Sequence, residues 1–207
     1  MLDDLIKFFV VLLVVVEPLS LLPVLAGLTQ GADDSYRRHM SFKAVGIAAG
    51  VCIVFAIIGR TLLGLLCISV DAFKVGGGIL LFLLAIEMVF ARPSGVRSTT
   101  PREEEESHHR GDISVFPLAF PLIAGPGALA TILLAFAGVP YSSPLFFAQL
   151  GVIAVVLGLT LALMLATGPV LRVVGVTGSA VLARLLGVLL AALAVQFVMD
   201  GVIGAVS

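Results

Sequence analysis

The sequence predicts an all-α integral membrane protein with six transmembrane helices, arranged as two inverted three-helix repeats. Three observations support this fold class. Hydrophobic residues make up 60% of the 207 residues and charged residues only 12%, a composition far too apolar for a water-soluble globule of this size. The apolar residues also fall in membrane-length runs, and the two halves of the chain carry similar motifs.

Each apolar run reaches the length of about 20 residues that a helix needs to cross the hydrocarbon core. An outer-membrane barrel would instead show alternating segments of about ten residues, which this sequence lacks. The first run is interpreted as a retained helix and not a signal peptide, because it is too long and contains Glu17. The expected spans are 5–28, 42–67, 72–91, 113–138, 145–171 and 179–206.

Two motifs recur in the second half of the chain. The segment GILLFLLAIEMV at 78–89 returns as GVLLAALAVQFV at 187–198, and a proline interrupts the first span of each half, at Pro18 and at Pro126. Because each half holds three crossings, an odd number, the second repeat must be inverted relative to the first. The expected organisation is a first repeat over 1–91, a cytoplasmic linker over 92–112 and a second repeat over 113–207.

The basic residues indicate the orientation, since Lys and Arg gather in the cytoplasmic loops of membrane proteins. Lys7, Arg60 and Lys74 are assigned to the extracytoplasmic face, which places both termini outside the cytoplasm of a multi-pass inner (plasma) membrane protein. The acidic run at 103–106 is interpreted as a solvated part of the linker and not as a partner site. The other nine of the twelve basic residues fall on the cytoplasmic face: Arg37, Arg38, Lys43, Arg92, Arg97, Arg102, Arg110, Arg172 and Arg184.

The two proline-interrupted segments, 14–23 and 117–131, form the candidate binding site. A proline removes an amide donor and frees a carbonyl that hydrocarbon cannot satisfy, so this backbone must face protein, water or substrate. A half-helix that restarts beyond such a break points its N–H groups at an anion, for which a substrate carboxylate is suitable. Purely structural kinks are the alternative, but the matched positions in two inverted repeats favour a site. The expected substrate-binding residues are Glu17, Pro18, Ser20, Gly125, Pro126, Gly127, Ala128 and Thr131, together with Glu87 and its repeat counterpart Gln196.

Glu17 is an acid near the middle of a span, where a charge is costly unless it is paired, hydrated or protonated. It is therefore a candidate for proton coupling or for holding an ammonium group, and coupling to sodium is also left open. No nucleophile, base and orienting partner occur together, so an enzyme is not expected and there are no catalytic residues. No metal-binding spacing or cofactor motif is present, and basic residues that follow membrane topology exclude nucleic-acid binding. Gly46 and Gly50 form a G-x-x-x-G motif that favours tight packing or homo-oligomerisation.

Three segments resemble the MarC family of bacterial and archaeal inner-membrane proteins, also called the neutral amino acid transporter family. They are PLIAGPGA at 121–128, GGILLFLLAIEM at 77–88 and ALAVQFVMDG at 192–201, and the resemblance covers essentially the whole chain. It implies six helices in two inverted repeats, discontinuous helices 1 and 4, and, from some members, uptake of glycine and other small neutral amino acids. The chain departs from the family where it has Glu17-Pro18, since most members have Asn-Pro or Asp-Pro there.

The residues and the resemblance together predict a secondary transporter that moves small neutral amino acids, glycine- or alanine-like, across the inner membrane by alternating access. An exporter or channel for another small solute would use the same architecture, and a non-transporting membrane assembly factor is a further alternative. The direction of transport, the coupling ion and the oligomeric state are left open by the sequence.

Overall fold

The computed structural model describes residues 2–90 and 112–206, and this part of the chain is helical without any strand. It holds five helices long and apolar enough to cross a membrane, or six when one bent pair is counted as a single span. The all-helical membrane class is thus confirmed, whereas the linker expected at 92–112 lies, except for Asp112, outside the described residues. In order the helices are α1 (Leu2–Val16), α2 (Pro18–Leu28), α3 (Asp34–Leu65), α4 (Val70–Phe90), the π-helix η1 (Ser114–Ile123), α6 (Pro126–Phe136), α7 (Pro144–Leu165) and α8 (Thr167–Val206).

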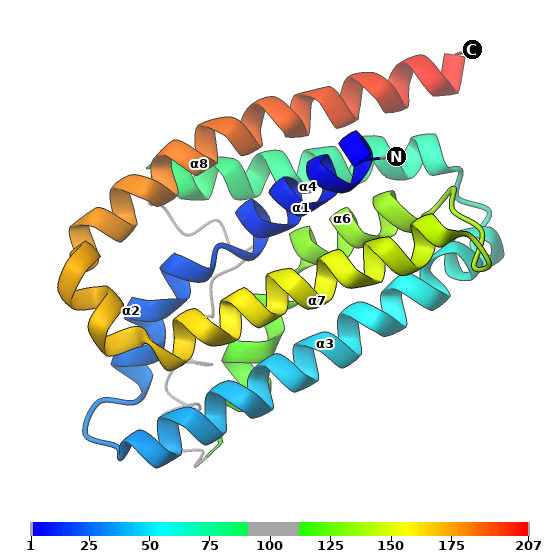
Figure 1. The fold of residues 1–207 in the computed structure, drawn as a ribbon. Helices are drawn as coiled ribbons and strands as arrows, with labels where there is room; N and C mark the ends of the chain where they lie inside the picture. Colours follow the sequence, from blue (N-terminus) through cyan, green and yellow to red (C-terminus); the bar gives the residue numbers. More distant parts are fainter. Residues whose placement is uncertain (1, 91–111, 207) are drawn as a thin grey trace.

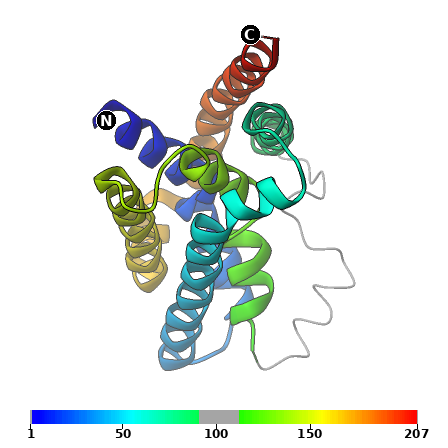
Figure 2. The same ribbon diagram turned by 90° about the vertical axis from the view of Figure 1, so that its right-hand side faces the viewer.

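The long helices run side by side as an elongated bundle (Figure 1). α4 packs along α8, and α3 packs on α7, η1 and α6, while α1 packs on both α6 and α7. The start of α1 and the end of α8 lie at the same end of the bundle (Figures 1 and 2), which is called the terminal end below. The other end, where α3 begins and α7 passes into α8, is called the opposite end.

The fifth span ends earlier than the sequence prediction of 145–171, whereas the candidate span Ala180–Val206 agrees with the prediction of 179–206. α7 ends at Leu165, and α8 begins at Thr167 and continues to Val206. Pro169 explains the early end, because proline breaks a helix interior but fits the first turn of a new helix. Gly175 interrupts α8 with φ 69° and ψ 167°, a positive φ that glycine adopts readily. The expected loop is therefore the first, offset part of α8.

α3 begins at Asp34, eight residues before the predicted start of the second span. Asp34 lies in the first turn, where a carboxylate is stabilised by the positive end of the helix dipole. The polar residues that follow it continue the helix beyond the apolar run. Near this end Lys43 donates a hydrogen bond to Asp112, which ties α3 to the start of η1 and, together with Ser114, lowers the pKa of Asp112 to about 2.

α4 and α8 approach each other through two glycines at equivalent positions of the sequence repeat. A β-carbon built on Gly78 of α4 would lie 2.9 Å from the carbonyl oxygen of Ala194 in α8. A β-carbon built on Gly187 of α8 would lie 3.2 Å from the carbonyl oxygen of Ala85 in α4. Both glycines therefore let the backbones approach closely, as small residues do between membrane helices.

Candidate functional site

The first span is interrupted at one residue. Glu17 has φ 51° and ψ 60°, and it separates α1 from α2, which begins with Pro18. The residue before a proline disfavours the right-handed helical region, and Glu17 takes the left-handed one, which residues other than glycine rarely adopt. Its side chain is 5% exposed, and Oε1 accepts a hydrogen bond of 2.6 Å from the hydroxyl of Ser20. The carboxyl group is thus held inside the bundle at the start of α2.

The second interruption is larger and lies between η1 and α6, whose axes differ by 55°. Within η1, Phe116 and Phe120 have extended backbone angles, and both precede a proline, as the steric restriction on pre-proline residues requires. Gly125 is the N-cap of α6, and a β-carbon built on it would lie only 2.3 Å from the carbonyl oxygen of Pro121. The tight return of the backbone at this point therefore requires glycine.

The two helices that start after these interruptions have the same kind of first turn. α2 begins with Pro18 and α6 begins with Pro126, and neither helix has a side-chain cap. The first amides of a helix have no intrahelical carbonyl to bind, and they lie at the positive end of the helix dipole. In α6 these amides include Gly127 and Ala128, so each half of the chain contributes one uncapped helix start.

The interruptions lie close together in the bundle. A β-carbon built on Gly127 would lie 3.0 Å from Val15 Cγ1 and 3.1 Å from Leu84 Cδ2, so the end of α1 and one face of α4 pack on the first turn of α6. A cavity of about 10 Å³ remains beside these residues and is lined also by Pro121 and Leu122. This volume holds about one water molecule. The space beside the α6 start is thus closed to a larger solute in this conformation.

Thr131 connects this region to a larger cavity at the terminal end. Its buried hydroxyl donates a hydrogen bond of 2.9 Å to the carbonyl oxygen of Gly127, one helical turn away. Thr131 also lines a cavity of about 290 Å³, which is called the terminal vestibule. Residues of α1, α6, α7 and α8 line the vestibule, among them Lys7, Val11, Thr131, Leu134, Gln149 and Phe197.

Gln149 belongs to none of the sequence motifs, yet its side chain is one of the few buried polar groups among the described residues. It is 4% exposed, and its Nε2 donates a hydrogen bond of 3.0 Å to the carbonyl oxygen of Ala135. Its Oε1 is buried and has no hydrogen-bond partner among the described residues, which costs about 1 to 3 kcal/mol. A buried polar atom of this kind points to a water, a ligand or a second conformation. The available signal was a lone amide in a 22-residue helix that is otherwise almost entirely apolar.

Glu87 and Gln196, which are counterparts in the sequence repeat, lie apart from each other. The contacts of Gly78 with Ala194 and Val198 place Gln196 level with Gly78 of α4, nine residues from Glu87 and therefore about 14 Å away along the helix axis. Gln196 is exposed, and its Nε2 donates a hydrogen bond of 2.6 Å to Asp200. Neither residue lines the small cavity or the terminal vestibule.

No group of three or more His, Cys, Asp or Glu residues within 2–90 and 112–206 is placed to hold a metal ion. The polar groups at the two interruptions are the carboxyl group of Glu17 and the hydroxyl group of Ser20 at the start of α2, and the uncapped first turns of α2 and α6. This set can hold a small molecule that carries both a negative and a positive group.

Comparison with known proteins identifies similar chains along the whole length. The MarC family, described as integral membrane proteins, matches residues 2–206. The inner membrane protein YhgN of Escherichia coli (strain K12) is 33% identical over 97% of this chain and 96% of its own. The membrane protein MJ1677 of Methanocaldococcus jannaschii is 33% identical over 92% of both chains, and YvbG of Bacillus subtilis is 31% identical over 99% of this chain and 96% of its own. No solved structure matches the chain significantly.

Proposed function

The chain belongs to the MarC family of integral membrane proteins, and we propose that it is a secondary transporter that moves small neutral amino acids across the inner membrane by alternating access. One observation carries the proposal: the end of α1, next to the buried carboxyl group of Glu17, packs on the first turn of α6, and both α2 and α6 are proline-led helices without a side-chain cap. Transporters with discontinuous helices bind their substrates at such places.

The packing of the helices supports two inverted repeats with discontinuous first helices. α1 and α2 run opposite to η1 and α6, and the pairs α3 with α7 and α4 with α8 are likewise antiparallel (Figure 1). α3 packs on η1 and α6 as α7 packs on α1 and α2, and α4 packs on α6 as α8 packs on α2. This exchange of partners is expected when a two-fold axis in the membrane plane relates the halves.

The glycine contacts between α4 and α8 support the same axis. Gly78 contacts Ala194, and their repeat counterparts Gly187 and Ala85 contact each other, so the contact is self-complementary in the manner of a two-fold interface. The level midway between these contacts falls near Leu81 and Leu190, which are both fully buried. The α4–α8 pair is thus the natural pivot about which the halves rock.

The chemistry of the two interruptions supports a zwitterionic substrate. The first amides of α2 and α6 favour a carboxylate, and the Glu17 carboxyl group, beside Ser20, suits an ammonium group. Because Val15 and Leu84 leave room for about one water, a small substrate needs the least movement of the helices to fit. The proposed binding residues are Glu17, Pro18, Ser20, Gly125, Pro126, Gly127, Ala128 and Thr131.

The terminal vestibule supports a route to this site. It has a volume of about 290 Å³, and its wall includes Thr131, whose hydroxyl binds the carbonyl of Gly127 at the α6 start. Lys7 and Asp4 also line the vestibule, so charges of both signs are present there. In the proposed cycle this conformation is closed at the interruptions and open toward the terminal end.

Counterflow in proteoliposomes tests the function. Liposomes that contain the purified protein are loaded with an unlabelled amino acid, and uptake of labelled glycine, alanine, serine, leucine, lysine and glutamate is measured. We expect saturable exchange of the small neutral amino acids only. Flux that rises linearly with concentration would instead indicate a channel, and no exchange above protein-free liposomes for any member of the panel would contradict the proposal.

A further inference from the structure

A second large cavity opens at the opposite end of the bundle, far from the terminal vestibule. It has a volume of about 480 Å³ and lies where α3 begins and α7 passes into α8. Three guanidinium groups and a single carboxylate line it, so the cavity carries a net positive charge. Its lining residues include Asp34, Arg37, Arg38, Leu165, Gly168 and Arg172.

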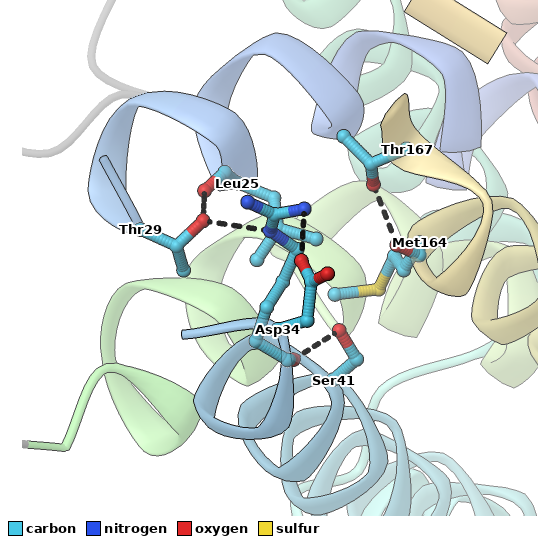
Figure 3. A network of polar contacts seen from close by, with 7 residues as sticks. Leu25, Thr29, Asp34, Ser41, Met164 and Thr167 are labelled. Atoms are coloured by element: carbon cyan, nitrogen blue, oxygen red, sulfur yellow. Dashed lines mark hydrogen bonds and ion pairs between the residues drawn. The ribbon is translucent and has the colours of Figure 1, made fainter. Parts of the chain in front are cut away.

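Arg37 is already engaged by protein groups. Its Nε donates a hydrogen bond of 3.2 Å to the hydroxyl of Thr29, and its Nη1 lies 3.3 Å from Asp34 Oδ1 (Figure 3). The Thr29 hydroxyl in turn donates a hydrogen bond of 2.7 Å to the carbonyl oxygen of Leu25. This network fixes the wall of the cavity and joins the end of α2 to the start of α3, while Asp34 compensates the charge of Arg37.

Arg38 and Arg172 have no such compensation. Among the described residues neither Arg38 nor Arg172 forms an ion pair, so two guanidinium groups face one cavity without an acidic partner. Two like charges that share a cavity favour an anion between them. The planar guanidinium group matches a phosphate with two parallel hydrogen bonds, which makes phosphate the suitable anion.

The position of the cavity indicates a membrane lipid as the source of the phosphate. The candidate span of α3 starts at Asp34 and that of α7 ends at Leu165, so the cavity lies at the level where lipid headgroups meet the helices. Leu165 lines the cavity and is 38% exposed, and Val173, next to Arg172, is 87% exposed. A lipid would match both the basic cavity, which binds its phosphate, and the exposed apolar surface beside it, which contacts its acyl chains.

We propose that this cavity binds the phosphate group of an anionic membrane lipid, with Arg38 and Arg172 as its ligands. Basic pockets between membrane helices hold lipid headgroups in this way. The site is separate from the proposed substrate site, and it would attach the first part of α8, before Gly175, to the start of α3.

Thermal unfolding of the purified, delipidated protein in a neutral detergent tests the proposal. Phosphatidylglycerol should raise the Tm of the wild type by several degrees more than phosphatidylcholine does. The double variant Arg38→Gln/Arg172→Gln should lose this difference, because both ligands are removed while the Arg37 network stays intact. The matched control is Arg184→Gln, which removes an exposed arginine of the same helix outside the cavity and should respond like the wild type.

Two further measurements separate loss of lipid binding from misfolding of the variant, and binding of a lipid from binding of free phosphate. If the double variant does not fold, native mass spectrometry of Arg172→Gln should still show loss of the phosphatidylglycerol that the wild type and Arg184→Gln retain. Inorganic phosphate should neither stabilise the wild type nor displace the lipid. Equal stabilisation by both lipids, equal responses of the wild type and the double variant, or displacement by inorganic phosphate would each overturn the lipid site.

Discussion

Glu17 combines two unfavourable features in one residue. Its carboxyl group is buried in an apolar span, where an acid is costly, and its backbone is left-handed, which adds about 1 to 2 kcal/mol. The hydroxyl of Ser20 donates a hydrogen bond to this carboxyl group. A residue that remains in such a conformation against its own preference is a reasonable candidate for a role in the transport cycle.

We expect Glu17→Gln to uncouple transport from a pH gradient while exchange of one amino acid for another continues. The amide keeps the shape and the hydrogen bond to Ser20, but it cannot gain or lose a proton. Exchange and gradient-driven uptake are measured side by side in proteoliposomes, with Asp200→Asn as the control acid near the terminal end. Weaker binding at every pH without a change in coupling would instead assign Glu17 to the substrate ammonium group. Wild-type behaviour in both assays would remove Glu17 from the site.

At the scale of the helices, the contact between α4 and α8 depends on Gly78 and Gly187. These two glycines occupy the same position in the repeated segments 78–89 and 187–198. Alanine usually stabilises a helix interior by about 0.5 to 1 kcal/mol relative to glycine. At Gly78 and Gly187, however, a β-carbon would press on the backbone of the neighbouring helix at 2.9 Å and 3.2 Å. The packing penalty and the helix preference therefore act in opposite directions.

We expect Gly78→Ala and Gly187→Ala to destabilise the protein by about 1 to 3 kcal/mol each, the usual range for overpacking. Gly76→Ala is the matched control, because Gly76 lies in the same helix and a β-carbon there would meet no atom within 4 Å. This control should be neutral or stabilising. Thermal unfolding in detergent measures all three variants, and wild-type stability of both Gly78→Ala and Gly187→Ala would contradict the close α4–α8 contact.

The sequence predicted the helical membrane class and most span positions, because hydropathy and length determine them. It placed the end of the fifth span at residue 171, whereas α7 ends at Leu165, because the apolar run continues across Pro169 and hydropathy does not reveal a proline that starts a new helix. The sequence also predicted that Glu87 and its repeat counterpart Gln196 belong to the same substrate site. These two positions of the sequence repeat lie about 14 Å apart along α4 and α8, because Gly78 is the residue of α4 that lies level with Gln196.

Part of the site could be predicted and part could not. The interruption at Glu17 and the return at Gly125 are set by local chemistry, namely the steric effect of the following proline and the lack of a β-carbon in glycine. The terminal vestibule and the unpartnered Oε1 of Gln149 depend on how four helices pack, which no local pattern encodes. The packing also gives Gly127 a structural role that the sequence does not reveal, because its missing side chain makes room for Val15 and Leu84. A valine at this position would therefore test packing before it tested ligand binding.

At the scale of the whole molecule, the charges and the fold suggest one orientation. The start of α1 and the end of α8 lie at the terminal end (Figure 1), and Arg37, Arg38 and Arg172 line a cavity at the opposite end. Because basic residues are enriched on the cytoplasmic side, we expect a reporter fused after Ser207 to be exported and a reporter inserted near Thr100 to stay in the cytoplasm. Alkaline phosphatase and green fluorescent protein fusions measure this, and a cytoplasmic C-terminus would contradict the orientation.

In the proposed cycle a small amino acid binds between the two halves, beside the helix starts of α2 and α6. Leu122 offers a reporter, because it lines the small cavity next to Gly125 without belonging to the proposed binding residues. The chain has two cysteines, a buried Cys52 and an exposed Cys67. Replacing Cys52 by alanine and Leu122 by cysteine leaves Cys67 as an internal reference for reagent access.

The most direct measurement is the rate at which a small maleimide alkylates the cysteine at position 122 in proteoliposomes, with and without a saturating amino acid that the protein exchanges. We predict that the amino acid slows this reaction several-fold and leaves the rate at Cys67 unchanged, because the substrate occupies the space beside the α6 start. Equal rates at position 122 with and without the amino acid, in a variant whose counterflow is intact, would contradict a binding site between the two halves.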